Sequence, residues 1–180
     1  FYCFVHEHEH VYAHVYEESP EGASPVKTLS IYIHIPFCKR KCVYCDFYSI
    51  TDFSLKQDFV SCLCKEIELI QKTWDKYVVD TIYIGGGTPS TLAIQDIYTI
   101  LDKLNSRFKI NEDCEITMEV NPSTIDQSYL KEIYKLGVNR LSIGIQSLNN
   151  KELSFLGRLH DRNRAIQCFY EARNAGFSNI

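Results

Sequence analysis

Short apolar segments alternate along the chain with longer segments in which apolar residues recur every three or four positions. The short segments have the length and β-branched content of buried strands, and they cover residues 31–36, 81–84, 115–120 and 141–147. The periodic segments have the spacing of amphipathic helices, and they cover residues 55–74, 92–108, 130–136 and 165–172. The pattern predicts an α/β fold of four consecutive βα units, whose parallel strands belong to a barrel or to a doubly wound sheet.

Polar residues and glycines indicate where these helices begin and end. Ser54 with Gln57, and Thr124 with Gln127, match the capping box that opens many helices. Further boundaries are indicated by Gly137, Asp161 and Gly176. Four strands cannot close a barrel, so we expect more sheet after Ile180 and interpret the chain as the N-terminal part of a larger domain.

The first 28 residues do not follow this rhythm. Histidines alternate with glutamates and apolar residues at His6, His8, His10 and His14, and residues 19–25 have the composition of a linker. Alternate histidines share one face of an extended strand and could bind a divalent metal, but a lone short segment has no second shell to hold them, which favours a solvated extension. We therefore expect a poorly ordered His-rich extension at 1–28 and the barrel domain at 29–180.

Composition and charge narrow the functional classes. With 180 residues, 45% hydrophobic content and a formal net charge of −4, the chain is globular and gives no electrostatic reason to expect nucleic acid as a partner. No apolar run approaches the ~20 residues of a membrane span. The eight cysteines have no visible secretory leader before them, so we expect free thiols and a cytoplasmic location.

Three of the cysteines, Cys38, Cys42 and Cys45, lie on the loop after the first predicted strand. Their thiolates could hold a [4Fe–4S] cluster that keeps one iron free of protein ligands. They could instead bind structural zinc with His34 as the fourth ligand, or be unrelated buried thiols. We interpret the remaining cysteines as small buried hydrophobes: Cys3, Cys62, Cys64, Cys114 and Cys168.

Unusual residues also follow the other three strands. A run of three glycines follows the second strand, Glu119 and Asn121 end the third, and Gln146 ends the fourth. Because the carboxyl ends of parallel strands meet at one edge of a sheet, we expect an active site there. The glycines could contact a ligand or only form a tight turn. Glu119 could pair with a ligand ammonium, ribose hydroxyls or a basic neighbour, and Arg158 could bind a carboxylate or be solvated.

Six ordered segments resemble the radical S-adenosylmethionine family of oxygen-independent coproporphyrinogen III oxidases and their haem-chaperone relatives. They are YIHIPFC at 32–38, the cysteine loop at 38–45, GGGTPS at 85–90, EVNP at 119–122, NRLSIGIQS at 139–147 and LGRLH at 156–160. The resemblance implies a partial (β/α)6 radical SAM barrel, a parallel sheet that is incomplete at the C-terminus, with about four βα units in this chain.

The resemblance also implies cofactors and site residues. A [4Fe–4S] cluster would be held by Cys38, Cys42 and Cys45, and S-adenosylmethionine would chelate its fourth iron. The matching positions imply seven contacts to S-adenosylmethionine: Tyr32, Gly86, Gly87, Thr88, Glu119, Gln146 and Arg158. In this family the reduced cluster gives one electron to the sulfonium and a radical then abstracts hydrogen, so a reducing electron donor is an implied partner.

Phe47 separates the two branches of the family. The oxidases resemble C-x3-C-x2-C-x-C, whereas this chain has Phe47 at the place of the additional cysteine. The sequence therefore resembles the haem-chaperone branch, which implies haem binding and delivery to haem-accepting proteins. The alternatives are an oxidase of porphyrin biosynthesis that acts on a porphyrinogen, and a non-catalytic zinc-binding domain.

Three basic residues, Lys39, Arg40 and Lys41, lie between the first two cysteines of the loop. They could favour an anionic cluster or an acidic redox partner, or they could form a solvated turn. The sequence alone leaves these possibilities open.

Overall fold

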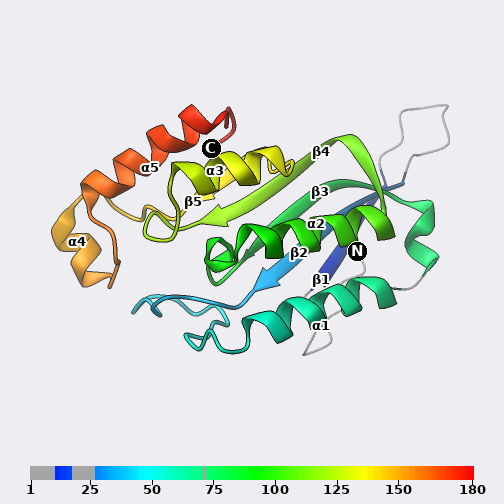
Figure 1. The fold of residues 1–180 in the computed structure, drawn as a ribbon, viewed down its shortest axis with the longest axis horizontal. Coiled ribbons are helices and arrows are strands. Elements are labelled where there is room, and N and C mark those ends of the chain that lie inside the picture. Colours follow the sequence, from blue (N-terminus) through cyan, green and yellow to red (C-terminus); the bar gives the residue numbers. More distant parts are fainter. Residues whose placement is uncertain (1–10, 18–26, 71) are drawn as a thin grey trace.

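The computed structural model describes residues 11–17, 27–70 and 72–180 (Figure 1). The strands are β1 (Val11–Glu17), β2 (Lys27–Ile35), β3 (Val78–Gly86), β4 (Lys109–Val120) and β5 (Arg140–Ile143). The helices are α1 (Lys56–Leu69), α2 (Ile94–Arg107), α3 (Gln127–Lys135), α4 (Asn150–Phe155) and α5 (Arg162–Ala175), with short 3-10 helices η1 (Lys72–Lys76) and η2 (Pro89–Thr91). None of the described helices has the length and apolar content required of a membrane span.

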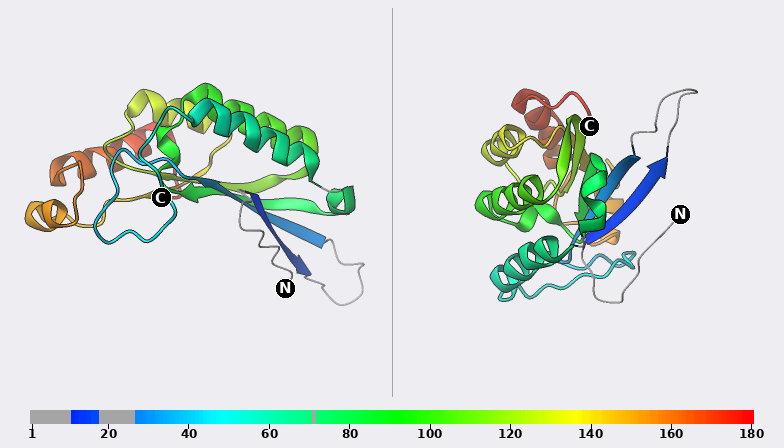
Figure 2. Two further views of the ribbon diagram at one scale, coloured as in Figure 1. Left: turned by 90° about the horizontal axis from the view of Figure 1, so that it is seen from below. Right: turned by 90° about the vertical axis from the view of Figure 1, so that its right-hand side faces the viewer.

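The sheet has the strand order β1-β2-β3-β4-β5. β2 to β5 are parallel to one another, and α1, α2 and α3 cover a single face of the sheet (Figure 2). A doubly wound sheet reverses its strand order and has helices on both faces, whereas a barrel keeps sequential order with all helices outside. The structure thus confirms the α/β prediction and selects the barrel type of sheet.

β1 occupies the edge of the sheet and runs antiparallel to β2, with Val11 opposite Ile33 and Glu17 opposite Lys27. The sequence analysis assigned residues 1–28 to a separate extension. The structure differs for residues 11–17 and 27–28, which belong to strands. Without β1, the backbone N–H and C=O groups at this edge of β2 would lack partners, and the antiparallel strand satisfies them.

The interpretation of the alternate histidines as metal ligands falls mostly on residues that the structure does not describe. His6, His8 and His10 lie outside the described residues, and only the backbone of His14 is described. Metal binding by this segment therefore stays a hypothesis from the sequence.

The core of the domain fills the space between the sheet and its helices. Alternate residues of β2 face it, and Ile31, Ile33 and Ile35 are at most 2% exposed. Leu63 of α1 and Ile100 of α2 are fully buried in the same cluster. Burying one such side chain stabilises the fold by about 1.5–3 kcal/mol. Packing of apolar side chains therefore holds this face of the sheet, which we call the covered face.

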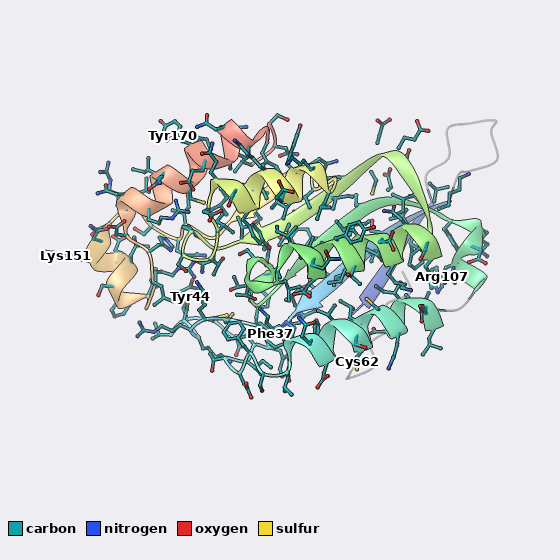
Figure 3. All side chains as sticks on the ribbon, viewed as in Figure 1. Phe37, Tyr44, Cys62, Arg107, Lys151 and Tyr170 are labelled. Atoms are coloured by element: carbon teal, nitrogen blue, oxygen red, sulfur yellow. The ribbon has the colours of Figure 1, made fainter. Side chains whose placement is uncertain are left out.

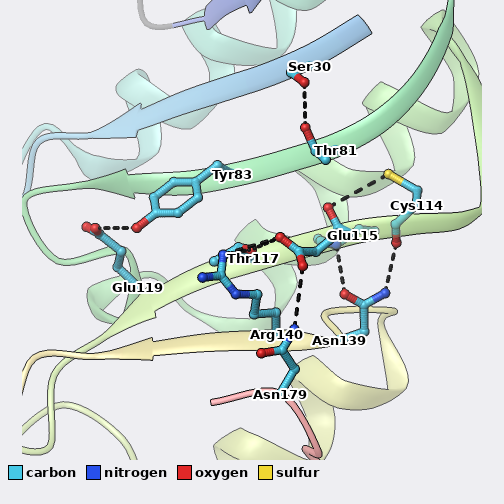
Figure 4. A network of polar contacts seen from close by, with 11 residues as sticks. Ser30, Thr81, Tyr83, Cys114, Glu115, Thr117, Glu119, Asn139, Arg140 and Asn179 are labelled. Atoms are coloured by element: carbon cyan, nitrogen blue, oxygen red, sulfur yellow. Dashed lines mark hydrogen bonds and ion pairs between the residues drawn. The ribbon is translucent and has the colours of Figure 1, made fainter. Parts of the chain in front are cut away.

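The opposite face of the sheet, which we call the open face, carries mainly polar side chains. Residues that pair across the strands share this face: Ser30, Tyr32, His34, Thr81, Tyr83, Glu115, Thr117, Glu119, Arg140 and Ser142. Thr81 donates a hydrogen bond to Ser30 at 2.7 Å, and Arg140 forms an ion pair with Glu115 at 3.2 Å (Figure 4). Period-two alternation along each strand thus separates an apolar face from a hydrogen-bonded one.

Both predicted capping boxes are wrong. α1 has Leu55 at its N-cap without a side-chain hydrogen bond, and the Ser54 N–H donates to Asp52 at 2.8 Å. α3 has Asp126 at its N-cap, where the carboxylate accepts from the Tyr129 N–H at 2.8 Å. Short polar side chains near a helix start compete for the same role, and the local turn decides which one caps the helix.

Two predicted elements are also longer than the observed ones. The helix predicted through Trp74 ends at Leu69, and Trp74 lies in η1. The strand predicted over 141–147 ends at Ile143. Three other boundaries are confirmed: Asp161 caps α5, and Gly137 and Gly176 take positive φ angles just after α3 and α5. The last residues begin to pair along β5, because Asn179 forms a parallel bridge with Arg140.

Candidate functional site

A pocket of about 260 Å³ lies at the carboxyl ends of the parallel strands. The loop after β2 and the ends of β3, β4 and β5 contribute to it, as the sequence analysis expected from the positions of the unusual residues. The residues of the predicted site that line the pocket are Cys38, Cys42, Cys45, Gly86, Gly87, Thr88, Glu119, Gln146 and Arg158. The structure thus brings nine of the ten predicted site residues together, and Tyr32 is the exception.

The cysteine loop is tied to the sheet by backbone hydrogen bonds. The Cys38 N–H donates to Ile50 at 2.9 Å, and the Ile50 N–H donates to Pro36 at 2.7 Å, so the loop returns to its starting point. The Thr88 N–H donates to Phe37 at 2.8 Å and joins the loop to the end of β3. These bonds fix the position of Cys38 although much of the loop is exposed.

Two polar side chains contact the sulfurs of the loop. Thr88 Oγ1 lies 3.4 Å from Cys38 Sγ, and Arg158 Nη1 donates to Cys42 Sγ at 3.4 Å. Cys38, Cys42 and Cys45 are free thiols. Hydrogen bonds to thiolate sulfur stabilise the charged form and tune an iron–sulfur centre. The surroundings of the sulfurs therefore suit thiolate ligands.

The zinc site with His34 is not formed. His34 Nε2 donates to the Tyr48 carbonyl at 2.9 Å, which leaves Nδ1 to accept from the Tyr32 hydroxyl at 3.2 Å. Both ring nitrogens thus have protein partners, and the histidine supports the loop instead of facing a metal. Among the described residues, no three His, Cys, Asp or Glu side chains are grouped as one metal ion requires. A cubane cluster binds each thiolate through a different iron, so its ligands need not meet at one point.

The glycine run both packs tightly and lines the pocket. A Cβ on Gly87 would come within 2.9 Å of the Ile35 carbonyl oxygen, and Gly86 has φ +106° with the His34 ring 2.7 Å from its ideal Cβ. Both positions accept only glycine without displacement of their neighbours. The two interpretations of this run, a tight turn and a ligand contact, are therefore compatible with each other.

Glu119 is held at the pocket by two donors. The Tyr83 hydroxyl donates to Oε1 at 2.8 Å, and the Gly86 N–H donates to Oε2 at 3.1 Å (Figure 4). Burial raises the pKa of Tyr83, and the Glu119 carboxylate raises it further, so the phenol remains a donor. The carboxylate keeps free lone pairs for a ligand.

Tyr32 lies on the open face beside Tyr83, with which it pairs across β2 and β3. Its ring stacks on Tyr83 with centroids 6.0 Å apart, and its hydroxyl contacts His34. It does not line the pocket, so its contact with S-adenosylmethionine stays a prediction from the resemblance.

Gln146 has φ +68°, the one positive φ among the described non-glycine residues. Such a conformation is uncommon for a glutamine and occurs often at binding sites. The sequence predicted this residue at the end of a strand, whereas it lies three residues beyond β5 in a turn that exposes it to the pocket.

Arg158 joins the last part of the site to the cysteine loop. Nη2 donates to the Gly144 carbonyl at 2.6 Å, and Nη1 contacts Cys42 and, at 3.4 Å, the Tyr44 hydroxyl. Its buried Nε finds no hydrogen-bond partner among the described residues. An unsatisfied donor of this kind favours an anionic ligand nearby.

Sequence reasoning missed Tyr44 and Tyr83. Tyr44 lies between the second and third cysteines and lines the pocket (Figure 3), and burial raises the pKa of its hydroxyl. Tyr83 is two residues before the first glycine, on a strand between the apolar residues Ile82 and Ile84. Its period-two relation to Gly85 could have placed it on the same face as Glu119.

The remaining cysteines differ in their burial. Cys114 and Cys168 are buried, as predicted, and burial raises the pKa of each thiol to about 11. The prediction was wrong for Cys62, which is exposed on α1, away from the cysteine loop (Figure 3). Cys64 is partly buried, and Cys3 lies outside the described residues.

The sequence is similar to those of several known proteins. The "Heme chaperone HemW" of Escherichia coli (strain K12) is 42% identical over 157 residues, which are 84% of this chain and 41% of that protein. The "Radical S-adenosyl methionine domain-containing protein 1, mitochondrial" of Danio rerio is 37% identical over 145 residues, 80% of this chain and 33% of that protein. This chain therefore spans about two fifths or less of the length of these relatives.

A solved structure is similar as well. The coproporphyrinogen III oxidase (HemN) from Escherichia coli, described as a radical SAM enzyme, superposes with a TM-score of 0.76 at 32% identity, over 82% of this chain and 34% of that chain. Residues 32–180 match the Radical SAM superfamily, and this segment contains the end of β2, all of β3 to β5 and the whole pocket. The chain belongs to the radical SAM superfamily.

Proposed function

We propose that this chain binds a [4Fe–4S] cluster and S-adenosylmethionine in the pocket, as part of a haem chaperone. The observation that carries the proposal is the convergence of three free cysteines with the ends of β3, β4 and β5 on one pocket. Three thiolates would leave one iron of a cubane without a protein ligand. When bound, the cluster would supply the one-electron reduction of the sulfonium.

The other pocket residues fit the remaining groups of S-adenosylmethionine. Glu119 offers a fixed acceptor to the ammonium or the ribose hydroxyls, and Arg158 offers a guanidinium to the carboxylate. Gln146 can bind the ribose, and the ring of Tyr44 gives an aromatic face for the adenine. Gly86, Gly87 and Thr88 leave room for the ligand beside the cysteine loop.

Haem delivery is the function that the relatives' names and Phe47 favour. Several relatives between 34% and 42% identical are named haem chaperones. Phe47 lines the pocket at the place where the oxidases of the family have another cysteine. The second candidate is an oxygen-independent coproporphyrinogen III oxidase, an oxidoreductase, because the similar solved structure is such an enzyme.

The test uses the full-length protein after anaerobic reconstitution. We expect four irons with sulfide per chain, haem binding by absorbance titration, and transfer of haem to an apo-haem protein. Decarboxylation of coproporphyrinogen under reducing conditions with S-adenosylmethionine would establish the oxidase instead. Stoichiometric zinc without iron would reject both.

We propose a reducing compartment for this protein, the cytoplasm. Support comes from the described cysteines, which are all free thiols. The animal relatives from Danio rerio and Mus musculus are named mitochondrial, and fractionation of cells that express the full-length protein decides between the two compartments.

A further inference from the structure

The chain makes a tight turn at Gln146 after it leaves β5. The Ser147 N–H donates to the Ile145 carbonyl at 2.9 Å, a hydrogen bond that spans three residues and defines a γ-turn. Gln146 lies at the centre of this turn with φ +68°. The γ-turn with a positive central φ is rare and strained, and such strain persists only where the surrounding structure holds it. Contacts from outside the turn are therefore required.

His160 provides such a contact. Its Nε2 lies 3.1 Å from the Ile145 carbonyl oxygen. Because a carbonyl oxygen only accepts, Nε2 carries the hydrogen and donates it. The histidine is 6% exposed, and its Nδ1 finds no hydrogen-bond partner among the described residues. The bond to Ile145 therefore orients the buried ring.

Two donors on the Ile145 carbonyl fix the peptide group that precedes Gln146. This carbonyl accepts from Ser147 and from His160, so both of its lone pairs are used. Rotation of the same peptide group about the N–Cα bond of Gln146 changes φ, and it would break both hydrogen bonds. The Ser147 bond belongs to the turn itself, whereas His160 is fifteen residues away from Ile145 in the chain. His160 is thus the support that comes from outside the turn.

The segment between α4 and α5 holds the turn at two consecutive carbonyls. Arg158 Nη2 donates to the Gly144 carbonyl at 2.6 Å, and His160 donates to the next carbonyl, that of Ile145. Gln146 Nε2 and Arg158 Nη2 each lie 3.3 Å from the place that a Cβ on Gly144 would take. Gln146 and Arg158 line the pocket, whereas His160 does not. The segment therefore sets how the Gln146 amide lies beside the guanidinium.

We propose that His160 is a positioning residue, which holds the γ-turn and thereby places the Gln146 amide for the ribose of the bound nucleoside. The inference rests on the proposed function, because the ribose contact of Gln146 belongs to the S-adenosylmethionine site. His160 acts through the backbone, since it lies outside the pocket. If its ring only filled space, an apolar side chain of similar size would serve equally well, and the experiment is built on that difference.

The experiment compares two substitutions of His160 in the reconstituted full-length protein. H160Q keeps a side-chain N–H near the position of Nε2, whereas H160L keeps the bulk and removes the donor. F177L is the matched control, because Phe177 is buried just after the other end of α5, where its ring packs against Tyr134 with centroids 5.1 Å apart. This control loosens the packing around α5 without removing a donor from the turn.

Amide hydrogen exchange of residues 143–149 tests the turn in the absence of ligand. We expect exchange in this segment to be about tenfold faster in H160L than in the wild type, because the turn opens more often when one of its donors is lost. H160Q and F177L should stay within about threefold of the wild type. Iron and sulfide are determined for every variant, so that only proteins with equal cluster content are compared.

Titration with S-adenosylmethionine tests the consequence at the pocket. H160L should raise the dissociation constant about fivefold, the size of one weakened hydrogen bond, and H160Q should raise it less than about twofold. In a Q146A background H160L should have no further effect, because His160 acts through the side chain of Gln146.

Unchanged amide exchange in H160L would overturn the proposal, and so would an equal increase in F177L, which would show a general loss of stability. A loss of affinity that persists undiminished in the Q146A background would also overturn it, because His160 would then act elsewhere. Failure of the wild type to bind S-adenosylmethionine would reject the proposed function and the ribose contact with it. The amide exchange needs no ligand, so it still decides whether His160 holds the turn.

Discussion

The two faces of the sheet are stabilised in different ways although they belong to the same strands. On the covered face, Ile33 and Ile84 are fully buried under the helices. On the open face, Tyr83 and Glu119 are joined by a hydrogen bond and stay partly accessible. The covered face fixes the shape of the domain, and the open face presents Glu119 to the pocket.

This difference predicts that substitutions on the covered face change stability, whereas substitutions at the pocket change ligand affinity. Removal of a buried methylene on the covered face lowers the free energy of unfolding, because a cavity remains. Loss of a polar group at the pocket lowers ligand affinity and leaves the packing intact. The following predictions test that separation, in order of decreasing effect.

The largest effect is expected when a cysteine of the loop and a buried cysteine of the core are each replaced by alanine. Cys42→Ala should abolish the four-iron cluster and leave the melting temperature of the metal-free protein within error. Cys168→Ala, on the buried face of α5, should keep the iron and cost about 1 kcal/mol of stability, since it removes a small buried group. Iron analysis and thermal unfolding measure both. Normal iron content in Cys42→Ala would refute its role as a ligand.

A core substitution should give the next largest effect. Leu63→Ala should lower the free energy of unfolding by about 2–5 kcal/mol, because Leu63 is fully buried between α1 and the sheet. Phe155→Ala is the control, since its side chain is 81% exposed and should change stability by less than about 0.5 kcal/mol. Urea unfolding measures the two values. Equal losses would contradict the assignment of the core.

At the pocket, Tyr83→Phe tests whether the phenol positions Glu119. We expect the dissociation constant for S-adenosylmethionine to rise about three- to tenfold, the size of one lost hydrogen bond. In a Glu119→Ala background, which removes the acceptor, the same change should have no further effect, because Tyr83 acts through the carboxylate.

Isothermal titration of the reconstituted protein measures the dissociation constant for the wild type, the two single variants and the double variant. Tyr98→Phe is the control, since this residue is exposed on α2, away from the pocket. Additive effects of the two pocket substitutions would show that Tyr83 supports the fold and not the carboxylate.

The smallest effect concerns His160, which is buried under the turn after β5 and contacts the Ile145 carbonyl through Nε2 at 3.1 Å. Burial lowers the pKa of His160, and the nearby Arg158 guanidinium lowers it further. The unfolded chain, with a pKa of about 6.5, therefore takes up a proton first as the pH falls.

The contribution of His160 to stability should be complete above about pH 6.5 and decline as the pH falls towards the pKa of the folded state. His160→Gln should flatten the pH dependence of the unfolding free energy over that range. An unchanged slope in this variant would remove His160 as its cause.

Local patterns were sufficient for most of the fold. The spacing of apolar residues predicted all four parallel strands and the main helices, because burial of one face leaves a direct trace in the sequence. The helix starts at Ser54 and Thr124 were wrong, since Asp52 and Asp126 offered competing hydrogen bonds within the same turns. Asp161 was correct, because its carboxylate accepts from the Arg164 N–H at 2.8 Å.

The residues of the candidate site were less predictable from the sequence than the fold. The cysteines and glycines were found because their chemistry is unusual at any position. Tyr83 was missed, since a tyrosine in a strand is ordinary until its neighbour Glu119 is known. Gln146 was found from its place at the end of a predicted strand, but its left-handed backbone could not be anticipated, because φ above zero is imposed on a glutamine only by its surroundings.

The sequence by itself determined the alternation of strands and helices, the chemistry of the cysteine loop and the gathering of functional groups at the strand ends. These follow from local periodicity and from the rule that parallel strands share one carboxyl edge. The barrel type of sheet, which the family resemblance implied, is confirmed, and the tertiary structure alone decided that His34 supports the loop and that Tyr83 holds Glu119. Each of these depends on partners distant in the chain, whose distances and orientations arise only when the strands are in register.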